Sequence, residues 1–163
     1  MTIIKIFLIT ITTLFFTACS SKEYSKQESA FIVLKTPTFK HADLGFIYEG
    51  NDSLKVEIYS SGQPVMRLNI TDDNVCMSLF ECMDKKSFNK TVLNEAYPNS
   101  ILQNIFKAQK IFDGRNMLKI RNGFTQTIKD TNKYEIEYSV LNKQVLFRDR
   151  MNNILIKVKR MGR

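Results

Sequence analysis

The stretch KVEIYSSGQPVMRLNI (Lys55–Ile70) contains two runs of alternating apolar and polar side chains, separated by Ser60–Gly62. Side chains two positions apart in an extended strand point to the same side, so this alternation predicts strands with one buried face. Serine and glycine between two such runs are typical of a tight turn, and Pro64 fits its exit. We therefore expect an antiparallel hairpin whose apolar row is Val56, Ile58, Met66, Leu68 and Ile70.

The same alternation continues on both sides of this hairpin. Leu44, Phe46 and Tyr48 would share one face of a preceding strand, and 75–80 would form a strand after the turn residues Asp72 and Asp73. Turn signals at Asn122–Gly123, Asn142–Lys143 and Asn152–Asn153 accompany later strands, which are marked by Phe124 and Ile128, by Tyr134, Ile136, Tyr138 and Val140, by Val145–Arg148, and by Ile154, Ile156 and Val158. The pattern predicts a long antiparallel meander.

After residue 86 the apolar period changes from two to the helical 3.6. Ser87 is a suitable N-cap for a first helix, in which Phe88 and Val92 share a face and which Pro98 ends. A second helix beginning near Asn99 carries a narrow apolar stripe, namely Ile101, Leu102, Ile105 and Phe106. Helices this short are not stable alone, so both should pack on the sheet.

Together these elements predict an α+β, mainly β fold: an antiparallel open or half-closed β-barrel covered by two short helices. The length suits one domain with a real core, and we expect it to span residues 31–163.

The N-terminus predicts export. A basic head ending at Lys5, an apolar run from Ile6 to Phe16 and the small residues Thr17 and Ala18 form the three parts of a signal peptide. The apolar run is eleven residues long, whereas a membrane-spanning helix needs about twenty. Residues 1–18 should therefore be removed.

Phe16-Thr17-Ala18-Cys19 resembles the lipobox of bacterial lipoproteins. The resemblance implies that Cys19 becomes the first residue and carries thioether-linked diacylglycerol and an acylated amine, with no other cofactor. Ser20 in place of aspartate favours the outer membrane, on its periplasmic face. The alternative is an ordinary cleaved signal peptide. Residues 19–30 have little to bury, so after the acylated cysteine we expect a flexible tether.

The chain has 24 basic and 16 acidic residues and a formal net charge of +8. The basic residues concentrate near the C-terminus, at Arg148, Arg150, Lys157, Lys159, Arg160 and Arg163. Such a surface suits anionic lipid head groups, or it simply confers solubility. We do not expect a nucleic acid partner, because an exported, tethered protein rarely meets one.

Motifs for catalysis or metal binding are missing from the sequence. His41 is the only histidine, and no GxSxG, HExxH or P-loop pattern occurs. Asp72 with Asp73, and Asp149, are carboxylates that could serve acid-base chemistry, but adjacent aspartates at a strand end are usually turn residues. We therefore expect neither an enzyme nor a metal site.

Cys76 and Cys82 remain as an even pair in an oxidising compartment, which favours a disulfide over two free thiols. A bridge requires α-carbons within about 7 Å, whereas six residues of straight strand span about 20 Å. The prediction therefore requires the chain to bend near Phe80 and Glu81.

The order of these elements resembles the LolB and LolA type of lipoprotein-localisation protein. The likeness rests on KVEIYSSGQPVMRLNI, VCMSL, SFNKTVLNEAYP, SILQNIFKAQKIF and IEYSVLNKQVLFRDRMNNILIKVKRM, which cover most of the mature chain. It implies an unclosed β-barrel capped by helices, whose apolar interior receives the acyl chains of lipoproteins. The family also carries an exposed apolar residue on a loop of its early hairpin, where this chain has only Ser60–Gln63.

The first functional hypothesis is therefore a lipid-anchored protein that shelters acyl chains in an apolar cavity and assists lipoprotein localisation or envelope assembly. The cavity candidates are Phe46, Tyr48, Val56, Ile58, Met66, Leu68, Ile70, Phe88, Leu102, Ile105, Phe106, Ile136, Tyr138, Ile154 and Ile156. The alternative is an interaction lipoprotein with a filled core, whose exposed strands or basic end dock another envelope protein.

Overall fold

The computed structural model describes residues 24–78 and 80–162 of the chain. Six strands come first: β1 (Lys26–Lys35), β2 (Lys40–Glu49), β3 (Ser53–Ser60), β4 (Gln63–Thr71), β5 (Asn74–Met77) and β6 (Phe80–Asp84). Helices α2 (Lys85–Val92) and α3 (Ile101–Phe106) and the 3-10 helix η2 (Phe112–Gly114) follow. Five strands complete the chain: β7 (Met117–Ile120), β8 (Gly123–Asp130), β9 (Tyr134–Leu141), β10 (Gln144–Asp149) and β11 (Ile154–Arg160).

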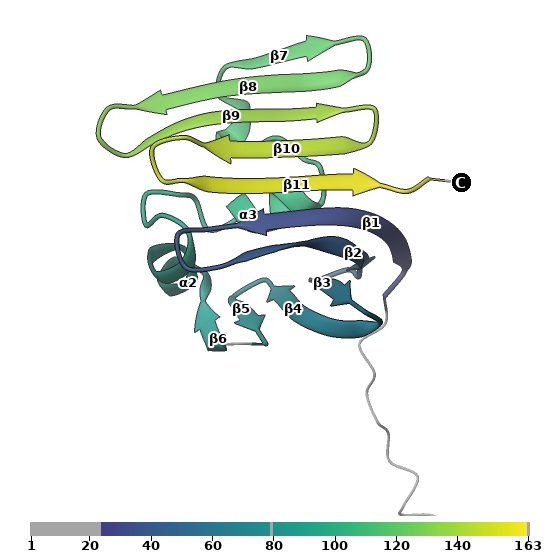
Figure 1. Cartoon of the computed structure of the whole chain (residues 1–163). Helices are drawn as coiled ribbons and strands as arrows, with labels where there is room; N and C mark the ends of the chain where they lie inside the picture. Colours follow the sequence, from purple (N-terminus) through teal and green to yellow (C-terminus); the bar gives the residue numbers. More distant parts are fainter. Residues whose placement is uncertain (1–23, 79, 163) are drawn as a thin grey trace, which may run out of the picture.

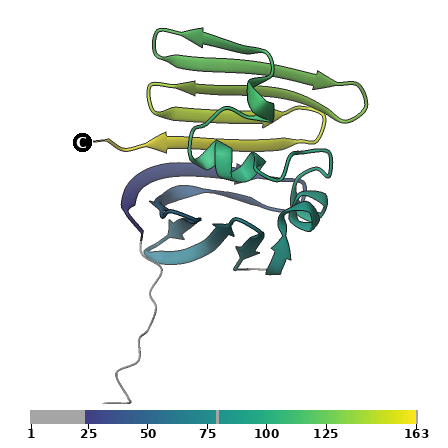
Figure 2. The ribbon, with the colours of Figure 1, turned by 180° about the vertical axis from the view of Figure 1, so that it is seen from behind.

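The eleven strands of the described residues belong to one sheet, in the order β6-β5-β4-β3-β2-β1-β11-β10-β9-β8-β7, and every pair is antiparallel (Figure 1). The sheet is therefore two meanders joined side by side where β1 pairs with β11. Because the first meander ends at one edge and the second begins at the other, the helical segment must cross the sheet between them. Figure 2 shows both helices on a single face. The predicted mainly β fold with two short helices is confirmed, and the sheet is not closed.

We call the face beneath the helices the inner face and the opposite one the outer face. Apolar residues from the strands and both helices form one core on the inner face. In the hairpin of β3 and β4, Val56 lies opposite Leu68 and Ile58 opposite Met66, which confirms the predicted pairing. Ser61 and Gly62 both have positive φ, at 50° and 78°, as a two-residue type I′ turn requires.

The predicted tether is too long. Lys26–Ala30 belong to β1, in which Lys26 pairs with Glu49 of β2 and Ala30 lies opposite both Gly45 and Arg160. The alternation in KQESAFIVLK is hidden because its outward positions Phe31 and Val33 are also apolar. The predicted signal peptide (1–18) and Cys19 lie outside the described residues.

Leu44, Phe46 and Tyr48 share one face of β2, as predicted, but this is the outer face, so the prediction that Phe46 and Tyr48 line the interior is wrong. Ile47 is fully buried on the inner face, while Phe46 and Tyr48 are half-buried on the outer face. Gly45 explains this register, because a Cβ at that position would lie 2.1 Å from the backbone oxygen of Glu57 in β3. Only glycine allows the two strands to approach there with Ile47 turned inward.

Helix α2 begins three residues earlier than the cap prediction. Asp84, not Ser87, is the N-cap: its carboxylate accepts hydrogen bonds from the Ser87 backbone N–H at 2.9 Å and from the Ser87 hydroxyl at 2.6 Å. In α3 the predicted stripe of Ile101, Leu102, Ile105 and Phe106 is buried, as expected. None of the helices in the described part of the chain is long and apolar enough to cross a membrane.

Candidate functional site

The inner face gathers thirteen of the fifteen predicted cavity residues into the core. Each is at most 3% exposed: Val56, Ile58, Met66, Leu68, Ile70, Phe88, Leu102, Ile105, Phe106, Ile136, Tyr138, Ile154 and Ile156. A side chain that lined an accessible hollow would keep contact with a water-sized probe. In this conformation the space between the sheet and the helices is therefore occupied by the protein's own side chains.

Phe46 and Tyr48 are the two candidates that do not join this core. They lie in an aromatic cluster on the outer face, with the Tyr48 ring 5.6 Å from that of Tyr24 and the Phe46 ring 5.8 Å from that of Tyr59. The Lys55 ammonium sits 4.0 Å from the Tyr48 ring centre, a cation–π contact. Between Phe46, Tyr59, Leu44 and Met161 lies a shallow apolar hollow of about 120 Å³.

Glu57 of β3 is buried beside this aromatic cluster although it points to the outer face. Its carboxylate accepts hydrogen bonds from Arg67 at 2.8 Å and from the Tyr59 hydroxyl at 3.1 Å, and Lys55 lies 3.5 Å away. Burial raises the pKa of Glu57, but the hydrogen bonds and the two cations outweigh it, so the pKa lies below its ordinary value. The side chain is thus ionised and ties β3 to β4.

Gln126 of β8 fastens the segment after α3 to the inner face. Its amide accepts from the Ile111 N–H at 2.9 Å and donates to the Ile111 carbonyl at 2.9 Å and the Arg115 carbonyl at 2.8 Å. The side chain is 1% exposed, so it supplies partners for backbone groups that water cannot reach.

Tyr97, between the two helices, makes a second link. Its hydroxyl donates to the Asp149 carboxylate, which also accepts from the backbone N–H groups of Glu135, Met151 and Asn152 and from the Asn152 amide. Burial and the neighbouring carboxylate both raise the pKa of Tyr97, which therefore stays protonated. With both oxygens of Asp149 engaged, this buried carboxylate organises the β10–β11 turn.

A third group of contacts joins the end of α3 to the strands at the middle of the sheet. Arg160 of β11 donates to the Phe106 carbonyl and, at 2.8 Å, to Glu28 of β1. Burial raises the pKa of Glu28, but hydrogen bonds from Arg160 and Lys26 outweigh it and leave the pKa below its usual value. The Tyr138 hydroxyl donates to the Gln109 carbonyl at 2.8 Å nearby.

Strand β7 is a surface feature that sequence reasoning missed. It lies at one end of the strand order, and its side chains Leu118 and Ile120 are 64% and 45% exposed. Arg115, Lys119 and Arg121 are exposed beside them, and no ion pair within the described residues involves these three. No local signal marks β7 as an edge, because its position depends on the distant pairing of β1 with β11.

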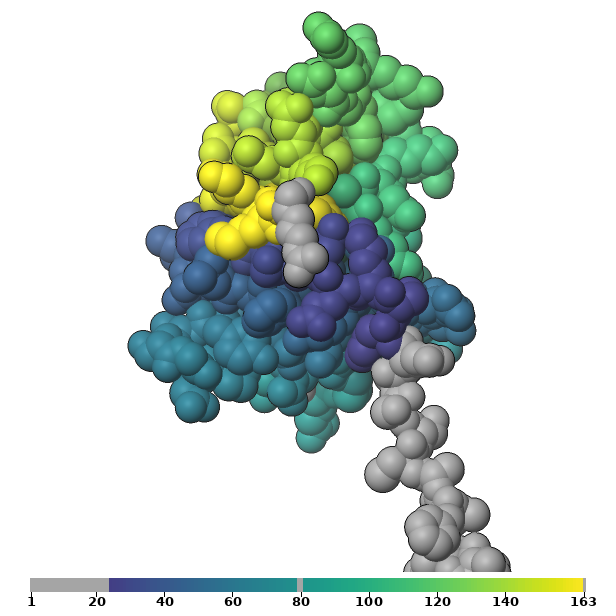
Figure 3. All heavy atoms as spheres, turned by 90° about the vertical axis from the view of Figure 1, so that its right-hand side faces the viewer, coloured from purple at the N-terminus to yellow at the C-terminus, as the bar shows by residue number. Residues whose placement is uncertain are grey.

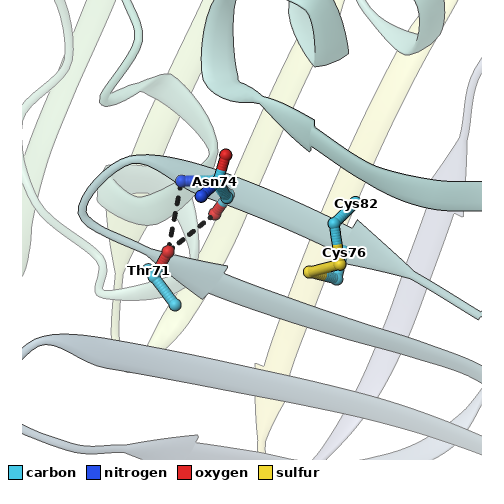
Figure 4. The surroundings of a disulfide bond; sticks show 4 residues. All are labelled: Thr71, Asn74, Cys76 and Cys82. Carbon is cyan, nitrogen blue, oxygen red and sulfur yellow. Dashed lines mark hydrogen bonds between the residues drawn. A yellow bond between two sulfur atoms is a disulfide. The ribbon is translucent and has the colours of Figure 1, made fainter.

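The predicted disulfide between Cys76 and Cys82 is present in the structure. Cys76 and Cys82 are joined by a disulfide across β5 and β6, with their α-carbons 4.0 Å apart (Figure 4). The chain reverses between Met77 and Phe80, which pair with each other, slightly before the expected bend. Thr71 and Asn74 close the preceding turn, where the Asn74 N–H donates to the Thr71 hydroxyl at 3.1 Å.

The basic C-terminal residues are divided between the two faces. Arg148, Lys157 and Lys159 are exposed on the outer face, whereas Arg160 turns inward, and Arg150 contacts Glu137 at 2.7 Å. Arg163 lies outside the described residues. The predicted basic end is therefore not one continuous patch.

The chain matches no known family profile, and no curated protein is similar to it in sequence.

Proposed function

We propose that the protein is a lipid-anchored lipoprotein of the outer membrane that faces the periplasm and docks another envelope protein through the edge strand β7. The anchor would be the acylated Cys19 of the lipobox-like sequence. The observation that carries the docking surface is the exposure of Leu118 and Ile120 on an edge strand.

An edge strand offers a row of backbone donors and acceptors to a second polypeptide. β7 has a neighbour in the described sheet, β8, on one side only. An extended segment of a partner can add to the free side by backbone hydrogen bonds, while its apolar side chains cover Leu118 and Ile120. Arg115, Lys119 and Arg121 favour acidic residues in that segment. The proposed partner is therefore a protein that offers an extended, apolar and acidic segment.

The filled core supports a role on the surface. Six apolar side chains of the helical segment are buried against the sheet: Phe88, Val92, Ile101, Leu102, Ile105 and Phe106. Exposing them would cost about 9–18 kcal/mol at 1.5–3 kcal/mol for each side chain. An acyl chain that leaves a membrane is already in an apolar environment, so its transfer would offset little of that cost.

The docking proposal is tested by placing a photo-crosslinking residue at position 118 in cells and, as a control, at the exposed Lys90 of α2. We expect one dominant adduct from position 118 that disappears with Ile120→Asp, because an acidic side chain on β7 would repel an acidic partner strand. Equal crosslinking from both positions, or none from position 118, would contradict the proposal.

The anchor is tested separately, by incorporation of labelled palmitate into the full chain and a Cys19→Ala variant. Incorporation that depends on Cys19, with recovery of the protein in outer-membrane fractions, is the expected result. A soluble, unlabelled protein would refute anchoring without bearing on β7.

The acyl carrier is the second candidate, and the open sheet favours it. Strands do not close the inner face; two helices of eight and six residues cover it instead. This arrangement agrees with what the resemblance to LolB and LolA implies. Native mass spectrometry of the chain from Ser20 decides between the two: stoichiometric lipid retained by the purified protein supports the carrier, and lipid-free protein supports the interaction module.

A further inference from the structure

We propose that the outer face of the four central strands, β2, β1, β11 and β10, lies against an anionic lipid bilayer and fixes the orientation of the anchored protein. This inference goes beyond the proposed docking through β7 and rests on the proposed anchor at Cys19 only for the position of the membrane. The occupant is the lipid surface itself: phosphate head groups and the acyl chains directly beneath them.

The strand register brings cations together on this face. Lys40 of β2 lies opposite Lys35 of β1, and Lys35 lies opposite Leu155 of β11. Two positions further along β11, Lys157 pairs with Val33, and Lys159 pairs with Phe31. Arg148 of β10 adds a fifth cation beside Leu155.

No carboxylate shares this face of the four strands within the described residues. The outward positions are Lys40, Ala42, Leu44, Phe46 and Tyr48 in β2, Gln27, Ser29, Phe31, Val33 and Lys35 in β1, Lys157 and Lys159 with Leu155 in β11, and Gln144, Leu146 and Arg148 in β10. The outward carboxylates nearest to this face lie on the two adjacent strands: Glu57 of β3 contacts Arg67, and Glu135 and Glu137 of β9 contact Lys129 and Arg150. Glu137 lies opposite Arg148 at the border of the face. All charged side chains on the outer face of the four central strands are therefore basic, and the carboxylates that border this face are paired with cations of their own.

Exposed apolar side chains stand among these cations. Phe31 is 39% exposed and pairs with Leu44, which is 51% exposed, and Met161 at the end of β11 is 50% exposed. The apolar hollow of about 120 Å³ opens beside Leu44 and Met161. Cations around a small apolar area match the interface of an anionic membrane, where side chains of both kinds are stabilised.

The chain enters the fold on this same face. Tyr24, the first described residue, packs its ring against outward-facing Tyr48, and the Lys55 ammonium lies 5.4 Å from the Tyr24 ring centre. Figure 3 shows the beginning of β1 beside the end of β11, in agreement with the hydrogen bond from the Met161 N–H to the Ser29 carbonyl. Cys19 precedes Tyr24 by five positions, a reach of at most about 18 Å. A tether this short brings the outer face close to the bilayer that holds the lipid.

The experiment uses the chain from Ser20 to Arg163, which lacks Cys19 but keeps every strand, both helices and the whole described core. It is mixed with vesicles of phosphatidylglycerol and phosphatidylethanolamine, or of phosphatidylcholine alone, and sedimented. We expect binding to the anionic vesicles that weakens with added salt, and little binding to phosphatidylcholine. Absence of binding to both would overturn the proposal.

A matched pair of variants tests the face. Lys157→Gln with Lys159→Gln should weaken binding to anionic vesicles about thirtyfold, since each cation near such a surface contributes about 1 kcal/mol. Lys86→Gln with Lys90→Gln removes the same charge from the exposed side of α2 and should leave binding unchanged. An equal loss of vesicle binding in both double variants would show that net charge alone drives binding. It would overturn the proposal that the outer face lies against the bilayer.

A second readout reports orientation. An environment-sensitive fluorophore on Leu44→Cys should shift to the blue when anionic vesicles are added, and one on Lys90→Cys should not. A shift at position 90 and none at position 44 would reverse the proposed orientation. These outcomes are separable from the proposed function, because palmitate incorporation and crosslinking at position 118 do not depend on vesicle binding by the chain from Ser20.

Discussion

Three buried polar side chains hold the helical segment on the inner face. Gln126 replaces a strand partner for Ile111, Asp149 accepts the Tyr97 hydroxyl, and Arg160 donates to the Phe106 carbonyl. Every buried side-chain nitrogen or oxygen in the described residues has a hydrogen-bond partner. Removing one member of such a pair leaves the other without water or protein to bond, which is costly.

Gln126→Leu should therefore destabilise the fold while keeping a similar side-chain volume. It leaves the Ile111 N–H and carbonyl buried and unpaired, at about 1–3 kcal/mol for each group, so the free energy of unfolding should fall by about 2–6 kcal/mol. Urea denaturation measures the change. Gln144→Leu on the exposed outer face is the control and should shift the free energy by less than about 0.5 kcal/mol; similar effects of the two substitutions would contradict the proposed clamp.

Glu57 gives the stability a defined dependence on pH. Its pKa is lower in the folded protein than in the unfolded chain, so its contribution is complete above the unfolded value of about 4.3 and disappears as the pH falls through the folded value. Glu57→Gln should lower the free energy of unfolding by about 1.5–3 kcal/mol at pH 7, the range for hydrogen bonds to a charged group. The cost should shrink at low pH, where Glu57 itself is neutral.

Urea unfolding of the wild type and the Glu57→Gln variant at neutral and acidic pH measures this convergence. Glu28, whose pKa is lowered in the same direction, leaves some acid dependence in the variant. Glu95→Gln, at an exposed position of the helical segment, should leave the wild-type profile unchanged. If Glu57→Gln lowers the free energy of unfolding equally at both pH values, packing and not charge accounts for the lost stability.

Among the elements, the hairpin of β5 and β6 depends most on a covalent bond. The two strands are four and five residues long and lie at one end of the strand order, so few neighbours support them. The disulfide closes this hairpin directly before α2, and thus fixes the point at which the chain leaves the sheet to cross the inner face.

Replacing both cysteines, Cys76→Ser with Cys82→Ser, should lower the free energy of unfolding by about 2 kcal/mol, the value expected for so small a loop. Treatment with a reducing agent should lower the free energy of unfolding of the wild type by the same amount and leave that of the double variant unchanged. Hydrogen exchange should locate the loss in β5 and β6. A wild type insensitive to reduction would show that the bond contributes nothing to stability.

The local pattern predicts some elements well and others poorly, for physical reasons. The hairpin of β3 and β4 is predictable because Val56 and Met66 alternate with polar neighbours that face water. In β2 both faces carry apolar side chains, so alternation alone does not decide which face turns inward, and the close approach of Glu57 to Gly45 appears only in the structure. The start of α2 is ambiguous in the sequence for a similar reason. Asp84 and Ser87 are both good N-cap residues, and Asp84 is the cap because β6 ends there.

The candidate sites also differ in how far the local sequence pattern predicts them. Most of the inner-face residues follow from alternation and helical stripes, which record burial directly. Whether those residues line a cavity or fill it depends on how closely the helices approach the sheet, which no pattern in the sequence encodes. The exposed Leu118 and Ile120 of β7 and the basic outer face both depend on the pairing of β1 with β11, more than a hundred residues apart in the chain.

The sheet as a whole depends on strand β1. It joins the first meander to the second, since it pairs with β2 on one side and with β11 on the other. The outer face, the entry of the tether and the Glu28–Arg160 contact all lie on it or beside it. A chain without β1 would have two separate meanders, each with an exposed edge and half of the core.

Three chains that begin at different residues test this dependence. A chain from Ser20 should unfold cooperatively and serve as the reference. A chain from Phe31, where a tether through residue 30 would place the start of the domain, loses Glu28 and leaves Arg160 with only the more distant carboxylate of Glu49, at 3.9 Å. It should be destabilised by about 1.5–3 kcal/mol, the range for a hydrogen bond to a charged group. A chain from Thr36 lacks β1 and should show no cooperative transition in urea; if it unfolds as cooperatively as the reference, β1 is not what joins the two meanders.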